Sequence, residues 1–206
     1  MDTYSVCFVC TGNICRSPMA EAVFRSHAAD AGLDGQVVAG SAGTGGWHVG
    51  DPADSRTAAV LKEAGYELDH VARQFEARQF EPDWFAEHDL VVALDEGHER
   101  ELRAMAPTQR DAAKIRLLRS YDPTASEGDG FGLDVPDPYY GGSEGFEECL
   151  RLVEAAVPGL LAEVGATLEE RAGGEARAGT APGGISGTAG TGRPAVAGEH
   201  STGEHR

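Results

Sequence analysis

Short apolar runs alternate with longer segments of helical periodicity over residues 4–170, and this alternation restricts the fold more than any other feature. Short apolar runs are typical of buried strands, whereas apolar residues three or four positions apart indicate helices. A repeating order of strand and helix favours a central, mostly parallel sheet with helices on both faces. The sequence therefore predicts a single α/β domain with a four-stranded sheet. The expected strands are 4–9, 36–41, 90–94 and 115–118, and the expected helices are 19–31, 55–64 (stopped by Gly65), 96–105 and 145–170 (kinked at Pro158).

The composition changes near position 171, which marks the expected end of the folded domain. Residues 171–206 are rich in glycine and alanine and contain no aromatic residue. Such a segment cannot bury enough apolar surface to offset the entropy lost on ordering. The sequence predicts a folded domain at 1–170, followed by a disordered tail at 171–206.

The chain is strongly acidic, with 17 Lys+Arg against 34 Asp+Glu and a net charge of −17 at pH 7. This charge repels nucleic acid and anionic lipid, so we expect neither nucleic acid nor a membrane as a partner. No run approaches the roughly 18 apolar residues of a membrane span, and no signal peptide is recognisable. We expect a cytoplasmic monomer.

Three of the four cysteines, Cys7, Cys10 and Cys15, are clustered near the N-terminus, which indicates thiol chemistry or a metal and not a disulfide framework. Zinc is disfavoured because no further Cys or His follows at the spacing of a zinc finger. A redox pair of Cys7 and Cys10 is disfavoured because such a pair opens a helix, whereas these residues end a predicted strand. Cys149 is expected to be buried in the last helix.

Residues 10–17, with the sequence CTGNICRS, follow the first predicted strand, where sheets of this class bind their ligands. A strand-to-helix turn of this length can wrap a tetrahedral oxyanion with backbone N–H groups and the positive end of the next helix. Gly12 and Asn13 tolerate the positive φ that a tightly curled loop requires. Ser17 before Pro18 is a good N-cap for that helix.

Two side chains of this loop carry the expected chemistry. Arg16 can donate two hydrogen bonds to phosphate oxygens. We expect the positive end of the helix and nearby cations to stabilise Cys10 as a thiolate. A thiolate aimed at a bound phosphoryl group is a nucleophile. The sequence therefore predicts a phosphate-binding loop with a nucleophilic cysteine.

A second motif, DVPDPYYG at residues 134–141, precedes the last predicted helix. Transfer of a phosphoryl group to Cys10 expels an alkoxide or phenoxide, which needs a proton. Asp137 is the expected donor because it lies in a loop stiffened by proline. Taken alone, Asp-Pro also begins many ordinary turns.

The segment 9–21, VCTGNICRSPMAE, resembles the signature of the low-molecular-weight protein-tyrosine phosphatases, and DPYY at 137–140 resembles the acid loop of the same family. The resemblance covers about residues 4–170. It implies a cysteine-dependent phosphatase that acts on phosphotyrosine-containing proteins through a phosphocysteine on Cys10. Arg16 would bind the phosphate, and Asp137 would act first as acid and then as base. The resemblance implies neither a metal nor another cofactor.

The resemblance also implies roles for residues around the loop. The expected phosphate- and substrate-binding residues are Thr11, Gly12, Asn13, Ile14, Cys15, Ser17, Trp47, Tyr139 and Tyr140. Ser17 would also steady the leaving thiolate, and Ser41 and His70 would hold the loop in shape through Asn13. Asp95 either matches a family position near the loop or only caps the next helix.

Cys10 and Cys15 would form a reversible disulfide under peroxide, as the same resemblance implies. The alternative is that Cys15 only packs within the loop, because thiols suit tight apolar sites. The tryptophan and the tyrosines would form the walls of a slot that suits a phenyl ring.

Three other functions are weighed against this one. Arsenate reductase relays oxidation through further cysteines, and none lies between Cys15 and Cys149. A branch of the same family with protein-arginine phosphatase activity carries threonine where this chain has Ile14, and an apolar residue suits an aryl ring better. A phosphotyrosine-binding module without activity would be expected to lack Cys10, Arg16 or Asp137, and all three are present.

Overall fold

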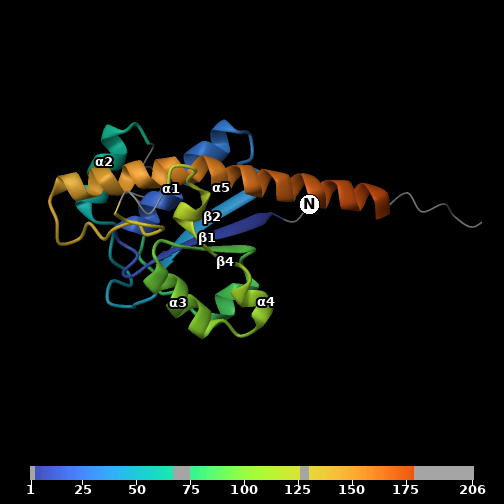
Figure 1. Ribbon diagram of the computed structural model, residues 1–206, viewed down its shortest axis with the longest axis horizontal. Helices are drawn as coiled ribbons and strands as arrows, with labels where there is room; N and C mark the ends of the chain where they lie inside the picture. The colour runs from blue at the N-terminus through green and yellow to red at the C-terminus, as the bar shows by residue number, and fades with distance from the viewer. Residues whose placement is uncertain (1–2, 67–74, 126–129, 179–206) are drawn as a thin grey trace, which may run out of the picture.

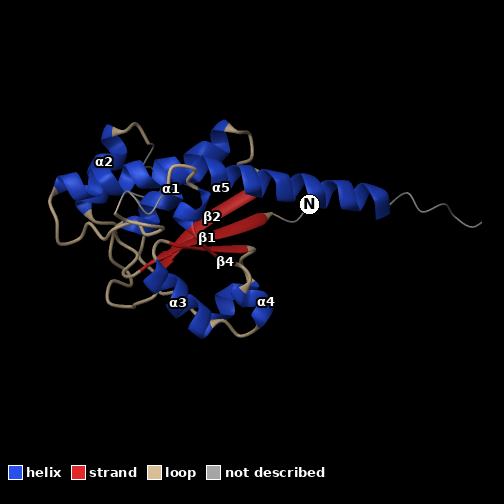
Figure 2. Cartoon of the chain, viewed as in Figure 1, coloured by secondary structure: helices blue, strands red, loops and turns tan. Residues whose placement is uncertain are grey.

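The computed structural model describes residues 3–66, 75–125 and 130–178. Four parallel strands form one sheet in the order β2-β1-β3-β4, and Figure 2 shows this sheet between layers of helices. The predicted α/β fold with a four-stranded parallel sheet is confirmed. The strands are β1 (Tyr4–Cys10), β2 (Val37–Gly43), β3 (Leu90–Ala93) and β4 (Ile115–Leu117).

Helices cover both faces of the sheet, as predicted (Figure 1). The helices on one face are α1 (Arg16–Asp30), α2 (Ser55–Glu63) and α5 (Ser143–Ala178); those on the other are α3 (Glu96–Met105) and α4 (Gln109–Ala112). Two 3₁₀ helices, η1 (Pro82–Ala86) and η2 (Leu118–Tyr121), complete the described elements. The sequence analysis missed α4, η1 and η2, because elements of one turn are too short to show a period.

Strand β1 lies in the middle of the sheet, and its side chains alternate between two apolar clusters. Val6 and Phe8 pack against α1 and α5, whereas Cys7 and Val9 pack toward η1 and α3. Successive side chains of a strand point to opposite faces, and both faces of this sheet are covered. This is why the strand reads as a continuous apolar run and not as an alternating one.

Helix α1 begins at Arg16, earlier than the predicted start at position 19, and this corrects the role expected of Ser17. The N-cap position is occupied by Cys15, whereas Ser17 lies inside the first turn and is fully buried. The Ser17 hydroxyl faces the sheet, 3.2 Å from the carbonyl oxygen of Ala42. Pro18 fits the first turn because the N–H that proline lacks has no partner there in any helix.

Helix α5 runs through Pro158 without interruption and continues to Ala178. Residues 171–178, which composition assigns to the tail, therefore belong to the helix. Their alanine, glutamate and arginine residues favour a helix, although two glycines oppose it. Arg171 ties this part of α5 to the domain, since its Nη2 lies 2.7 Å from Asp89 and its guanidinium covers the Tyr4 ring. Residues 179–206 lie outside the described residues. Within the described chain, no helix combines the length and the apolar character needed to cross a membrane.

The sheet positions the loop between β1 and α1. Because the strands are parallel, their carboxyl ends lie at the same edge, and loop 11–15 is bordered there by the ends of β2 and β3. This is the edge at which doubly wound sheets bind ligands.

The core between α1 and the sheet gives a prediction for stability. Phe24 is fully buried on α1, and its ring centroid lies 5.5 Å from that of Phe8. We expect Phe24→Ala to lower the free energy of unfolding by about 3–5 kcal/mol, because it removes buried apolar surface and leaves a cavity. Urea unfolding checks this. Val38→Thr, at a site that is 55% exposed on β2, should change stability by less than about 0.5 kcal/mol. Equal losses for the two variants would contradict the assigned core.

Candidate active site

Loop 11–15 exposes a row of backbone donors at the end of β1. The N–H groups of residues 12–15 have no hydrogen-bond acceptor within the described part of the chain. Asn13 has a φ of 56°, the only positive φ among the described non-glycine residues. Gly12 does not share it, although the sequence allows either residue to do so. Consecutive N–H groups on a curled turn form an anion-binding concavity.

Gly43, at the end of β2, lets the sheet approach this loop closely. A Cβ at this position would lie 2.7 Å from the carbonyl oxygen of Thr11 and 3.1 Å from the backbone nitrogen of Asn13. Any side chain at Gly43 would therefore push the loop out of its conformation.

A buried hydrogen-bond network holds Asn13 in its left-handed conformation. Its Nδ2 donates to Ser17 Oγ and to Ser41 Oγ, each at 2.9 Å, and its Oδ1 accepts from the Arg78 backbone N–H at 2.8 Å. Ser41 in turn donates to Glu21 at 2.7 Å. The structure thus places Ser41 beside Asn13, as predicted. His70, the other expected support, lies outside the described residues.

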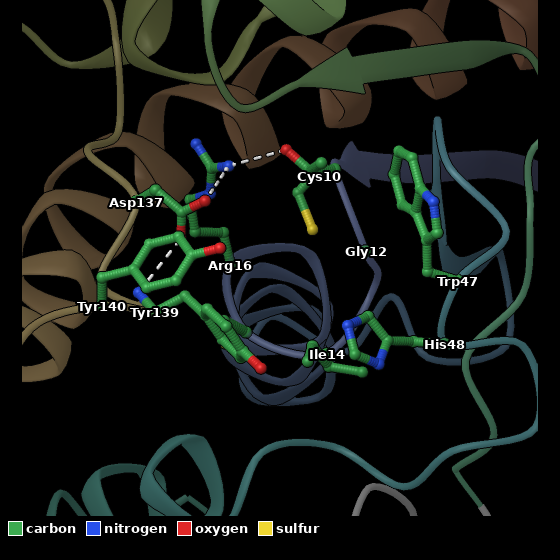
Figure 3. A pocket seen from close by; sticks show the side chains of 11 residues that line it. Cys10, Gly12, Ile14, Arg16, Trp47, His48, Asp137, Tyr139 and Tyr140 are labelled. Atoms are coloured by element: carbon green, nitrogen blue, oxygen red, sulfur yellow. Dashed lines mark hydrogen bonds and ion pairs between the residues drawn. The ribbon is translucent and has the colours of Figure 1, made fainter.

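Cys10 ends β1, and its sulfur points into the cavity above the loop (Figure 3). The Ser17 hydroxyl lies 3.0 Å from Cys10 Sγ. Its oxygen accepts from Asn13, so its own hydrogen is directed to the sulfur or to Ala42. Ser17 therefore occupies the place expected of a residue that stabilises a thiolate, although it does not cap the helix.

Arg16 is almost completely buried, and four oxygen acceptors surround its guanidinium. Nη1 donates to Asp95 Oδ2 at 2.7 Å and to the Val135 carbonyl at 3.1 Å. Nη2 donates to Thr11 Oγ1 at 3.1 Å and to Asp137 Oδ2 at 3.0 Å. Burial disfavours the charged guanidinium, but the charges on Cys10 and the two carboxylates outweigh it and raise the pKa of Arg16. Arg16 is thus a fixed positive charge at the base of the cavity.

Asp95 performs both of the roles that the sequence leaves open. Its Oδ1 caps α3 by accepting from the His98 N–H at 2.8 Å, while its Oδ2 pairs with Arg16. The buried His98 ring joins them, with Nε2 2.9 Å from Thr11 Oγ1 and Nδ1 3.0 Å from Asp95 Oδ1. Burial raises the pKa of Asp95, but hydrogen bonds from His98 and the nearby Arg16 charge outweigh it and hold the pKa well below its ordinary value. Asp95 is therefore a carboxylate that orients Arg16.

The loop that carries Asp137 is attached to the same edge of the sheet. The Val135 N–H donates to the carbonyl of Leu94 at 2.8 Å, just after β3. Arg119, itself buried, donates to the carbonyls of Gly132 at 2.7 Å and Asp134 at 3.3 Å. Asp137 is half-exposed and faces Cys10 across the cavity (Figure 3).

The cavity has a volume of about 350 Å³, and aromatic side chains form its walls. Trp47 and His48 lie on one side and Tyr139 and Tyr140 on the other, as Figure 3 shows. The predicted residues that line it are Cys10, Thr11, Gly12, Ile14, Cys15, Arg16, Trp47, Asp137, Tyr139 and Tyr140. Of the remaining predicted residues, Asn13 contributes its backbone N–H to the loop, and Ser17 and Ser41 lie behind the loop, where they accept hydrogen bonds from the Asn13 side chain.

The cysteines differ in their surroundings. Cys7 packs on the opposite face of the sheet from Cys10, so the three clustered thiols cannot share one metal ion. Burial raises the pKa of Cys15 to about 12, which keeps it a thiol at neutral pH. Cys149 is fully buried in α5, as predicted. A reversible Cys10–Cys15 disulfide stays a prediction.

The sequence model of the family described as "Low molecular weight phosphotyrosine protein phosphatase" matches residues 5–170. The chain belongs to this family. It is 66% identical over 170 residues to a low molecular weight protein-tyrosine-phosphatase of Streptomyces coelicolor, covering 82% of this chain and 99% of that protein. It is 47% identical over 159 residues to low molecular weight protein-tyrosine phosphatase A of Mycobacterium tuberculosis, covering 77% and 90%. The crystal structure of YfkJ from Bacillus subtilis superposes with a TM-score of 0.72 at 38% identity, covering 81% of this chain and 98% of that one.

The family description and the matched relatives name protein-tyrosine phosphatases, which are cysteine-dependent hydrolases. The family and the class of enzyme predicted from sequence are therefore confirmed.

The sequence analysis missed several residues of the site. Glu21 and Arg78 complete the Asn13 network, His98 joins Thr11 to Asp95, and Arg119 anchors the acid loop. Glu21 ends the signature segment, and His98 lies three positions after the N-cap Asp95, so both had a local signal. Arg78 acts through its backbone N–H and through a guanidinium hydrogen bond to the Ser41 carbonyl, and Arg119 acts through distant carbonyls. None of these contacts leaves a pattern in the sequence.

The lowered pKa of Asp95 gives a pH-dependent prediction. A carboxyl whose pKa is lower in the folded state stabilises the protein above its unfolded pKa of about 3.9, and this contribution is lost as the pH falls below that value. We expect Asp95→Asn to be less stable than the parent at pH 7, and the difference to shrink toward pH 3. Urea unfolding at several pH values measures it.

Asp34→Asn is the control for this measurement, because Asp34 is exposed. It should change stability by less than about 0.5 kcal/mol at either pH. A difference between Asp95→Asn and the parent that stayed constant from pH 7 to pH 3 would show that Asp95 is not held as a carboxylate by its neighbours.

Proposed function

We propose that this chain hydrolyses phosphotyrosine in proteins, with Cys10 as nucleophile, Arg16 as phosphate ligand and Asp137 as general acid and base. One observation carries the proposal. The Cys10 sulfur, the Arg16 guanidinium and the Asp137 carboxyl border a single cavity with aromatic walls (Figure 3). A thiolate, a fixed cation and a proton donor are the groups that phosphoryl transfer to sulfur requires.

In the first step, Cys10 Sγ attacks phosphorus and the bond from phosphorus to the tyrosyl oxygen breaks. Asp137 gives its proton to that oxygen, so that tyrosine leaves as a neutral phenol. The N–H groups of residues 12–15 and Arg16 bind the non-bridging oxygens, where charge develops. Arg16 Nη2 contacts Asp137 at 3.0 Å, so phosphate oxygens would compete for a donor that already faces the acid.

In the second step, water attacks the phosphocysteine and Asp137 takes the proton that the water loses. The bond between sulfur and phosphorus breaks, and inorganic phosphate is released with the thiolate restored. The Ser17 hydroxyl, 3.0 Å from Cys10 Sγ, stabilises that thiolate by hydrogen bonding.

The walls of the cavity favour an aryl phosphate over phosphoarginine. Ile14 contributes an apolar surface beside the nucleophile, and Trp47 and Tyr139 face each other across the opening. Flat aromatic walls pack well against a phenyl ring. A guanidinium would gain less from Ile14, because it has donors that an apolar side chain cannot satisfy.

The fold is compatible with an active domain at residues 1–170, to which the extension of α5 adds further contacts. A monomeric state, a cytoplasmic location and a disordered segment after α5 stay predictions.

Phosphate release from a phosphotyrosyl peptide in EDTA tests the nucleophile. We expect activity in the parent chain and its loss in Cys10→Ser, because an alcohol is a far weaker nucleophile than a thiolate at neutral pH. Cys149→Ala removes a thiol that lies outside the cavity and should retain activity. Activity in Cys10→Ser, or hydrolysis of phosphoarginine in preference to phosphotyrosine, would refute the proposal.

The leaving group tests the acid. We expect Asp137→Asn to lower kcat by about 10²–10⁴-fold with phosphotyrosine, since general-acid catalysis is worth that much. The loss should be smaller with 4-nitrophenyl phosphate, whose leaving group is stable as an anion and needs no proton. Stopped-flow measurement of product release from both substrates provides the comparison. An equal loss with both substrates would assign Asp137 a role in binding and not in proton transfer.

A further inference from the structure

A shallow depression lies beside the catalytic cavity, on the other side of Trp47. Its lining residues are Thr11, Thr44, Trp47, Glu101, Ala104 and Met105. Thr11 and Trp47 also line the catalytic cavity, so a continuous surface leads from the phosphate loop past the indole to α3. Trp47 is 77% exposed and borders both hollows.

The surface extends away from the phosphate loop along helix α3. His98 contacts Thr11 of the loop, and Glu101 follows three residues later, about 4.5 Å further along the helix axis. Residues three or four positions apart share one face of a helix, so Glu101 and Met105 continue the face that His98 begins.

The charges along helix α3 are unbalanced at one position. Glu96 lies 3.5 Å from Arg100, and Glu99 lies 2.8 Å from Arg103, so these carboxylates have partners on their own helix. Glu101 is exposed and has no ion-pair partner within the described residues. Glu101 lines the depression, so its carboxylate is available to a cation from another molecule.

We propose that this depression binds the polypeptide that flanks the phosphotyrosine, and that Glu101 selects substrates with a lysine or arginine there. The inference rests on the proposed function. The aliphatic stem of such a side chain would pack on Trp47 and Met105 while its charged end reaches Glu101. The indole face adds an attraction for the same cation. An extended chain advances about 3.3–3.6 Å per residue, so three residues on either side of the phosphotyrosine extend about 10 Å from it.

Matched phosphotyrosyl peptides test the proposal. The peptides differ only in carrying arginine, alanine or glutamate at one position, scanned over three residues on each side of the phosphotyrosine. With the full chain at low salt, arginine at the responsive position should raise kcat/KM about two- to fivefold over alanine, the range of an exposed ion pair. The gain should appear in KM and should shrink as salt screens the charges.

Variants of Glu101 test whether this residue causes the preference for arginine. Glu101→Gln should remove the advantage of arginine, and Glu101→Arg should shift the preference to the glutamate peptide. Glu63→Gln makes the same charge change at an exposed position that ends α2, on the opposite side of the sheet, and should keep the preference. Retention of the arginine preference in Glu101→Gln, or no preference in the parent, would overturn the assignment.

Free phosphotyrosine separates this inference from the proposed function, because it has no flanking residues. All three variants should hydrolyse it at the parental rate. If the parent hydrolyses phosphotyrosine but shows no dependence on Glu101, only the flanking site is refuted. If the parent fails to hydrolyse phosphotyrosine, the proposed function and the flanking site are refuted together.

Discussion

The buried guanidinium of Arg16 is the interaction on which the rest of the site depends. A buried charge is costly unless oppositely charged and polar groups surround it. Here those groups come from Thr11, Asp95, Val135 and Asp137, three of them far along the chain from Arg16. The phosphate loop, the end of β3 and the acid loop are thus held together by one side chain. The catalytic arrangement therefore depends on contacts between segments that are distant in the sequence.

The parallel sheet makes this convergence possible. Because all strands run the same way, the segments that follow β1, β2 and β3 emerge at one edge. Gly43 lets the end of β2 contact the loop, and the Leu94 carbonyl accepts a hydrogen bond from the Val135 N–H. The left-handed Asn13, braced by buried partners, then keeps the N–H groups of the loop turned toward the cavity. Backbone strain at a single residue is held in place by the surrounding packing.

The protein carries a large negative net charge and still forms a site for an anion. The chain as a whole carries −17, yet the cavity is built around N–H groups and Arg16, which attract an anion. Local donors decide phosphate binding because they act at contact distance, whereas surface carboxylates are screened over about 10 Å by salt. The acidic surface acts instead on the parts of a substrate outside the cavity. Glu101, which lines the depression beside Trp47, is the carboxylate that we propose selects a basic flanking residue.

The sequence by itself determined the chemistry and the class of fold. Cys10, the loop N–H groups and Arg16 lie within seven consecutive positions, so one strand-to-helix turn suffices to bring them together. The apolar runs likewise predicted all four strands, because strands buried on both faces need a continuous apolar sequence. The local pattern gave a wrong helix start at Ser17, because the side chain makes contacts that the pattern does not show. Ser17 has the sequence of an N-cap but is drawn into the helix, where it contacts Cys10 and Asn13.

Only the tertiary structure decided which distant groups meet. Asp95 and Asp137 lie 79 and 121 positions from Arg16. The family resemblance placed Asp137 at the site and allowed the same for Asp95, but only the structure shows that both carboxylates pair with Arg16. The same holds for the anchoring of the acid loop by Arg119 and for the end of α5, where Arg171 finds Asp89. These contacts follow from the packing of whole elements on the sheet, and packing depends on the complete chain and not on any short segment of it.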